Sequence, residues 1–374
     1  MKKENIRFYL FFILLAAPVF TFPFMKQYVD CTNYENRALA EFPQISPQTL
    51  LSFSKQYDAY FSDHLPYKNQ LAMLNTLKEE SLGEGTTVIE YLQKSISVIR
   101  GKEGWLFYGT AFDEEESVND YLCNNLYTEE ELKEIASGYD MLQKKLKKMG
   151  TDLVVFYAAN KEQVYPEYMP DSLVPGSYSR TDQLVDFIQQ NTDVPLIYTK
   201  NALKKEKKNH TLFYKYDTHW NDLGGFVGRQ LINEYFHGEY ISLDQASYSV
   251  VSRNQSGDLA GLLSVKSRYS DDTVYQIKCD NMGAGCTLLE DGGDYYVFSS
   301  DAADRRSVLI IMDSFGDALM GMADDFAKVI FTKEENNMKQ LLKKEKPDIV
   351  LLEIAERKKA AQETLCRKLS QCID

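Results

Sequence analysis

The stretch SVLIIMDSFG, residues 307–316, decides the fold that we expect for this chain. Its apolar residues leave no polar face, which is typical of a strand buried on both sides of a parallel sheet. Ser314 follows at the turn into a helix that we expect from about Asp317, and polar groups at such strand ends form the sites of open parallel sheets. Gly316 would permit a tight turn there and the close approach of a substrate.

Three more stretches continue this pattern along the chain. Helical patterns precede or separate them, and the first of these patterns opens with the capping box of Thr128 and Glu131. Buried strands that alternate with helices predict an α/β fold with a mainly parallel sheet. The expected strands are 152–158, 194–198 and 347–354, and the expected helices are 128–150, 181–190 and 222–236.

The N-terminus carries a long apolar segment, Ile6–Phe24, interrupted only by Arg7. Its length suits a transmembrane helix, and the lysines before it predict an N-terminus inside the cytoplasm and a main domain outside the membrane. A cleaved signal peptide is the alternative. We favour the uncleaved anchor, because the segment is long for a signal peptide and no good cleavage site follows it.

Composition argues against a nucleic-acid partner and does not determine how the cysteines pair. A net charge of -13 argues against nucleic-acid binding, which requires a basic surface. Six cysteines include two close pairs, Cys279 with Cys286 and Cys366 with Cys372, but the sequence does not determine their connectivity. No cysteine or histidine pattern suggests a metal site, and we expect no cofactor.

We divide the chain into three parts. Residues 1–30 form the predicted membrane anchor, and residues 31–127 form a helical lead-in with a short aromatic strand. Residues 128–374 form the α/β domain. Within that domain, residues 241–300 are rich in Ser, Gly, Asp and Tyr, which indicates an irregular or β-rich insertion.

A second motif, YDTHWNDLGG at 216–225, supplies the partners that a serine nucleophile needs. Such a serine requires a base to take its proton, and the base requires an orienting group. Asp217 and His219 are two residues apart, so an extended backbone would place them on one face. We therefore predict Ser314 as nucleophile and His219 as base, with Asp217 beside the imidazole. The following N–H groups of the serine turn would face an anion formed there.

Other polar residues follow the predicted strand ends. Asn160, Lys161 and Tyr165 come after strand 152–158, where they could line the cleft or serve the structure. Both interpretations stay open on the residues alone.

Several segments together resemble a known superfamily. They are ENRALAEFP (35–43), FSDHLPYKNQL (61–71), GKEGWLFYG (101–109), AANKEQVYPEYMP (158–170), YDTHWNDLGG, GDLAGLL (257–263), IIMDSFGDAL (310–319) and PDIVLLEIAER (347–357). With these segments the chain resembles SGNH-type hydrolases and acetyltransferases, and more narrowly the alginate O-acetylation proteins AlgJ and AlgX and the Firmicute DHHW family.

The resemblance implies a permuted SGNH fold with Asp217 and His219 before Ser314, in the roles already predicted. The chain departs from the SGNH pattern in two places: Met312 replaces the glycine of Gly-Asp-Ser, and the Gly-x-Asn-Asp block is absent. Arg357, at the end of the strand that occupies the place of that block, is therefore a candidate for binding an acyl oxygen or a substrate carboxylate.

The resemblance also implies a function. We expect an exported, membrane-anchored O-acetyltransferase of a cell-surface or secreted polysaccharide, working through an acyl-serine intermediate. Its expected partner is a membrane-bound O-acyltransferase that supplies acetyl groups. A carbohydrate or lipid esterase would use the same residues with water as acceptor. A non-catalytic scaffold of a polysaccharide-export complex is the alternative outside the enzymes.

Overall fold

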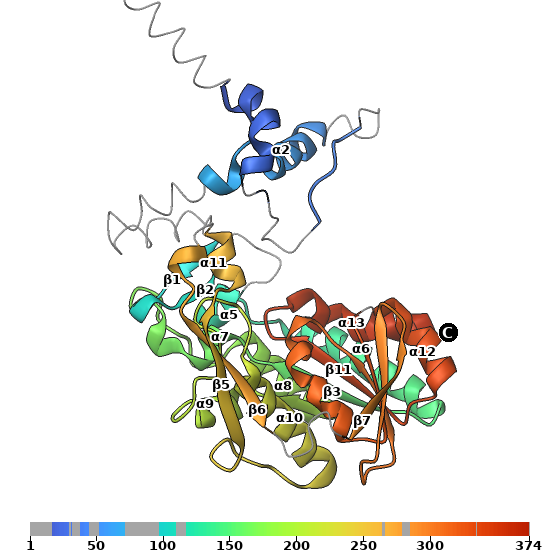
Figure 1. Ribbon diagram of the computed structural model, residues 1–374. Helices are drawn as coiled ribbons and strands as arrows, with labels where there is room; N and C mark the ends of the chain where they lie inside the picture. The colour runs from blue at the N-terminus through green and yellow to red at the C-terminus, as the bar shows by residue number, and fades with distance from the viewer. Residues whose placement is uncertain are drawn as a thin grey trace, which may run out of the picture. The chain divides into compact units, whose positions relative to one another are not determined.

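The computed structural model describes residues 17–29, 31, 38–44, 52–71, 97–109, 117–263, 266–278, 285–333 and 335–373. The chain separates into two compact units. The first comprises residues 1–86 and 260–268, and the second comprises residues 87–259 and 269–374. Figure 1 shows the helices and strands of both units.

The first unit contains η1 (Lys26–Tyr28), α2 (Phe53–Asp63) and η4 (Lys266–Arg268). Asp63, at the end of α2, is buried and its Oδ2 accepts the N–H of Ala40 at 2.7 Å. Most of the predicted transmembrane segment falls on residues 1–16, which lie outside the described residues. Within the described part of the chain, no helix has the length and hydropathy needed to cross a membrane.

The second unit is built on a seven-stranded sheet in the order β4-β3-β11-β9-β10-β8-β7. The first five strands are parallel, and the last two join the edge antiparallel. This agrees with the predicted mainly parallel α/β sheet. The bounds are β3 (Asp152–Ala158), β4 (Leu196–Tyr198), β7 (Cys286–Asp291), β8 (Tyr295–Ser300), β9 (Ser307–Ile311), β10 (Lys328–Thr332) and β11 (Ile349–Ala355).

Helices cover both faces of this sheet. Alternate residues of β3 show this, because Leu153, Val155 and Tyr157 pack with α6, α8, α12 and α13, whereas Val154 and Phe156 pack with α10 and η5. The capping box predicted at the start of α6 is present. The bounds are α6 (Glu129–Lys148), α8 (Arg180–Asn191), α10 (Asp222–His237), η5 (Ser314–Asp324), α12 (Met338–Glu345) and α13 (Lys359–Ile373).

The second unit also contains shorter elements, of which α11 continues into the first unit. Two small antiparallel ribbons are formed by β1 with β2 and by β5 with β6. The shorter elements are β1 (Val98–Arg100), η2 (Lys102–Gly104), β2 (Leu106–Tyr108), α5 (Ser117–Leu122), α7 (Lys161–Val164), η3 (Pro166–Tyr168), α9 (Lys200–Glu206), β5 (Ser247–Gln255), α11 (Asp258–Leu262), β6 (Asp272–Lys278) and η6 (Glu335–Asn337).

Three details differ from the sequence-based expectation. The helix expected from about Asp317 is a 3-10 helix, η5, and it begins at Ser314 itself. The strand β10 was not predicted. The segment 241–300 contains the β5–β6 ribbon, but its last strands, β7 and β8, extend the central sheet. The described cysteines are all free, including Cys366 and Cys372, and Cys279 lies outside the described residues.

Candidate active site

The parallel register brings the functional segments to one edge of the sheet. Ala158 of β3 pairs with Ala355 of β11, and Ile311 of β9 pairs with Leu352 of the same strand. The residues that follow these strands therefore gather at their carboxyl ends, as expected for an open parallel sheet. Ser314 follows β9, and Asn160 follows β3.

Asp313 fixes the turn that presents Ser314. Its Oδ1 accepts the N–H of Phe315 at 2.8 Å, and its Oδ2 accepts the N–H of Ala355 at 2.9 Å. Its own N–H donates to Glu353 Oε2 at 2.9 Å. Burial, and then the charge of Asp313, raise the pKa of the Glu353 carboxyl well above its usual range. One aspartate thus ties the serine turn to the neighbouring strand β11.

The N–H groups that follow the serine are engaged within the turn. Phe315 N–H donates to the Asp313 side chain, and Gly316 N–H donates to the Asp313 carbonyl at 3.2 Å. The prediction that these groups face an anion is therefore not met. Gly316 packs closely against Met312 of the protein itself, and a Cβ at position 316 would lie 2.4 Å from Met312 Cβ.

Asp217 and His219 meet through a turn, which corrects the expected extended backbone. The turn lies between Phe213 and Trp220, which form an isolated antiparallel bridge. Asp217 Oδ1 accepts the backbone N–H of His219 at 3.0 Å and lies 2.6 Å from His219 Nδ1. An aspartate that bonds the backbone two residues ahead is the usual way for this side chain to stabilise a turn.

His219 joins this turn to Ser314. Its Nε2 lies 2.7 Å from Ser314 Oγ, although 95 residues separate the two along the chain. Burial would raise the pKa of Asp217, but hydrogen bonding to His219 and the histidine's charge, with N–H donors from His219 and Asp258, lower it to about 2. Asp217 is therefore ionised at neutral pH and able to hold a proton on Nδ1, which leaves Nε2 to accept the serine proton. The structure brings the three predicted residues together in this order.

Aromatic packing fixes the imidazole from behind. The ring centroids of His219 and Phe315 lie 5.0 Å apart. Trp220 is buried and its Nε1–H donates to the Phe315 carbonyl at 2.9 Å. The two aromatic residues next to the base and the nucleophile therefore join their segments to each other.

Lys161 makes structural contacts, one of the two roles that the sequence left open for it, and it also lines a small cavity with Asn160 and Arg357. Its buried ammonium donates to the carbonyl oxygens of Tyr214, Lys215 and Asp217, at 3.1, 3.3 and 2.6 Å. Burial lowers the pKa of Lys161 to about 8, against the opposing charges of Asp217 and other aspartates. The three donors of Lys161 are thus used on the turn that carries Asp217 and His219.

The remaining predicted residues divide between cavity and core. Asn160 Oδ1 accepts the N–H of Arg357 at 3.2 Å, and Asn160 Nδ2 is buried with no hydrogen-bond partner among the described residues. Both residues line a small cavity next to Thr218. Arg357 lies over the Phe315 ring, 5.0 Å from its centroid. Tyr165 is a core residue, and its hydroxyl accepts the N–H of Leu212 at 2.9 Å.

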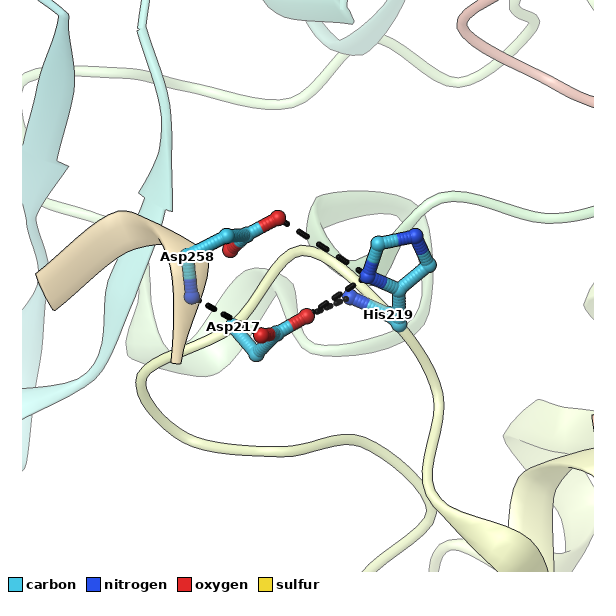
Figure 2. Close-up of side chains that lie close together, drawn as sticks. All are labelled: Asp217, His219 and Asp258. Carbon is cyan, nitrogen blue, oxygen red and sulfur yellow. Dashed lines mark hydrogen bonds and ion pairs between the residues drawn. The ribbon is translucent and has the colours of Figure 1, made fainter. Parts of the chain in front are cut away.

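Asp258 is a site residue that the sequence-based prediction missed. Its backbone N–H donates to Asp217 Oδ2 at 2.8 Å, and its Oδ2 lies 3.7 Å from His219 Nδ1 (Figure 2). The segment GDLAGLL, which supported the resemblance, was the available signal, but no role was attached to its aspartate. The three side chains place ligand atoms within 4.8 Å of one another, close enough to hold a metal ion. Hydrogen bonds to N–H and O–H groups already account for this grouping.

An open pocket of about 310 Å³ lies over the serine. Its described lining contains three aspartates and neither lysine nor arginine, although Lys333 pairs with one of them, Asp317, at 2.7 Å. A carboxylate accepts hydrogen bonds and donates none, so this lining suits ligands rich in donors, such as hydroxyl groups. The lining residues are Tyr214, Asp217, His219, Trp220, Asp222, Ser314, Asp317 and Ala318.

Residues 98–297 match the family model described as SGNH hydrolase-like domain, acetyltransferase AlgX. The chain belongs to this family. The match covers more than half of the 374 residues and includes Asp217, His219 and Asp258, but it ends before Ser314. Ser314 is therefore assigned to the site by its contact with His219 Nε2. No curated protein sequence matches the chain.

Solved structures show a likeness in fold. PatB1 of Bacillus cereus superposes with a TM-score of 0.50 at 13% identity, over 71% of this chain and 96% of its own. The O-acetyltransferase domain of Pseudomonas putida AlgJ gives 0.48 at 17% identity, over 74% and 99% of the two chains. A DHHW family protein from Eubacterium siraeum gives 0.46 at 15% identity, over 64% and 88%. At these identities the likeness to PatB1 supports the fold alone.

Proposed function

We propose that this protein is an O-acetyltransferase that acetylates hydroxyl groups of a cell-surface or secreted polysaccharide through an acetyl-serine intermediate. The observation that carries the proposal is the continuous chain of contacts from Asp217 through His219 to Ser314. Membership of the acetyltransferase AlgX family supports acyl transfer as the reaction. The aspartates that line the pocket above the serine can accept hydrogen bonds, which supports a sugar rich in hydroxyl groups as the acetyl acceptor.

The first half of the reaction loads the serine. His219 Nε2 takes the proton of Ser314 Oγ as that oxygen attacks the acetyl carbonyl, and Asp217 stabilises the imidazolium that forms. The tetrahedral intermediate collapses by breaking the bond to the donor oxygen, which receives the proton from Nε2. The products are acetyl-Ser314 and the free donor alcohol.

The second half transfers the acetyl group. Nε2 takes the proton of a sugar hydroxyl, whose oxygen attacks the acetyl-serine carbonyl. Collapse of the second tetrahedral intermediate returns the proton to Ser314 Oγ and releases the acetylated sugar. The buried Nδ2–H group of Asn160, which has no partner among the described residues, is our candidate donor to the oxyanion.

The cellular setting is part of the same proposal. The apolar segment Ile6–Phe24 would anchor the protein with its main domain outside the cytoplasm. A membrane-bound O-acyltransferase would deliver acetyl groups to that side of the membrane. This arrangement would place the serine between the acetyl supply and a polysaccharide acceptor.

Mass spectrometry of the protein after incubation with an activated acetyl ester tests the proposal. We expect an acetyl group on Ser314 in the wild type and none in Ser314→Ala. Decay of the adduct that accelerates with oligosaccharide, with acetylated sugar as product, is the expected result. Absence of both adduct and turnover with every ester would overturn it and favour the scaffold.

An esterase is the second candidate, because Ser314 is exposed and water can reach it. The same experiment separates the two reactions. An esterase would lose its acetyl group rapidly in water alone, and added oligosaccharide would change neither the rate nor the product.

A further inference from the structure

Asp258 approaches the turn of Asp217 and His219 at unusually close range. The residue before it, Gly257, has no side chain, and a Cβ there would lie 2.2 Å from the Tyr216 carbonyl oxygen. A larger residue at position 257 would push this segment away from the turn. The sequence Gly-Asp is therefore required for Asp258 to reach the site.

Hydrogen bonds then lock Asp258 to the turn at several points. Its backbone N–H donates to Asp217 Oδ2 at 2.8 Å. Its Oδ1 accepts the backbone N–H of Thr218 at 2.8 Å, and its Oδ2 accepts the Thr218 hydroxyl at 2.6 Å. Asp217 thus has one oxygen on His219 and the other on the backbone of Asp258, so it cannot rotate away from the imidazole (Figure 2).

Hydrogen bonding alone does not require a charge at position 258. The oxygen of an asparagine would accept the Thr218 N–H, and the Thr218 hydroxyl, which both donates and accepts, could turn to accept from the amide NH2. A second carboxylate beside Asp217 is electrostatically unfavourable. Burial, and then the charge of Asp217, raise the pKa of Asp258. Its Oδ2 nevertheless lies 3.7 Å from His219 Nδ1. The position of this second carboxyl group beside the base points to a role for its charge in the reaction.

We propose that Asp258 is a positioning residue of the acyl-transfer site: its N–H orients Asp217, and its carboxylate stabilises the imidazolium that forms on His219. The inference rests on the proposed function, because it assigns Asp258 a part in that same reaction. It adds a second carboxylate to the Asp-His-Ser arrangement and leaves the chemistry at Ser314 unchanged.

Other charges interact with Asp258 and are held constant in the test. Asp217 adds to the field of Asp258, whereas Arg357 and Lys161 oppose it. Removing the Asp258 charge makes the imidazolium less favourable, so the base becomes protonated only at lower pH. One charge at this distance moves the acidic limb of the kcat/KM profile by about one to three pH units.

The test compares Asp258→Asn with a matched control, Asp272→Asn. Asp272 also anchors the turn, since its Oδ2 accepts the N–H of Tyr216 at 3.2 Å and that of Lys215, but its described contacts do not include His219. Turnover of an activated acetyl ester is measured from pH 5 to 9, with urea unfolding to establish that each variant folds. Thr218→Val is a second variant, which removes the hydroxyl anchor and keeps both carboxylates.

We expect the acidic limb to move to lower pH in Asp258→Asn only, with kcat/KM at its optimum reduced by about three- to tenfold. Asp272→Asn and Thr218→Val should change the height of the profile without moving its acidic limb. An unmoved limb in Asp258→Asn, or an equal shift in Asp272→Asn, overturns the inference while the activity of the wild type still supports acyl transfer. Lack of acyl transfer in the wild type would instead refute the proposed function.

Discussion

Replacing Lys161 by methionine should impair the site without touching a reacting atom. Methionine has a similar length and fills the same apolar surroundings, but it cannot donate to the carbonyl oxygens of Tyr214, Lys215 and Asp217. These carbonyls belong to the turn that presents Asp217 and His219. The substitution therefore tests whether one buried ammonium group holds the catalytic turn in place.

The size of the effect follows from two opposing quantities. A buried acceptor left without a partner costs about 1–3 kcal/mol. The Lys215 carbonyl also accepts the N–H of Leu106, so only the carbonyls of Tyr214 and Asp217 lose their donor, at a cost of about 2–6 kcal/mol. Burial lowers the pKa of Lys161 from 10.5 to about 8. That shift corresponds to about 3 kcal/mol of unfavourable ammonium burial, which methionine does not incur. The lost hydrogen bonds outweigh this relief by a small margin, and we expect Lys161→Met to lower the free energy of unfolding by about 1 kcal/mol.

Urea unfolding and ester turnover together provide the assay. Displacement of the turn by about 1 Å should lower kcat/KM by at least about tenfold. Lys207→Met is the matched control, because Lys207 also donates to a buried carbonyl, that of Val164 at 2.6 Å, but none of its described hydrogen bonds reaches the turn. The control should lose stability and keep the kcat/KM of the wild type.

The pH dependence supplies a further check. The folded protein releases the Lys161 proton at about pH 8, whereas the unfolded chain keeps it to about 10.5. Stability of the wild type relative to Lys161→Met should therefore rise between these pH values. Unchanged stability and kcat/KM in Lys161→Met would refute the argument that this lysine holds the turn.

Two further predictions concern groups around the site. Burial, together with the charge of Glu356, raises the pKa of Glu162 from 4.5 to about 8. The stabilisation from protonated Glu162 is complete below pH 4.5 and is lost as pH rises through 8. Glu162→Gln should therefore gain stability relative to the wild type over that interval. Equal urea midpoints for the two proteins at both pH 5 and pH 8 would contradict this. Trp220→Phe removes the donor to the Phe315 carbonyl and should cost about 1–3 kcal/mol, with a lower kcat/KM. A melting temperature equal to that of the wild type would show that this bond does not hold the two segments together.

The sequence by itself was sufficient for the main architecture and for three site residues. A strand that is apolar throughout must be buried on both faces, with helices on each side of its sheet. The strands β3, β4, β9 and β11 were therefore predictable from local pattern. The carboxyl ends of parallel strands share one edge, which directed attention to Ser314. The short interval between Asp217 and His219 ensured that these side chains could meet, although through a turn instead of the expected strand.

The tertiary structure alone decided which other groups reach that site. Asp258 joins Asp217 from 41 residues away, and His219 reaches Ser314 across 95 residues. Lys161 follows a strand end, so the sequence left both a place in the cleft and a structural role open. Its ammonium donates to backbone carbonyls, which no side-chain pattern marks. Periodicity encodes which face of an element is buried, whereas a hydrogen bond between distant segments depends on how those elements pack. The contacts that hold Ser314, His219 and the turn of His219 in place are therefore visible only in the folded chain.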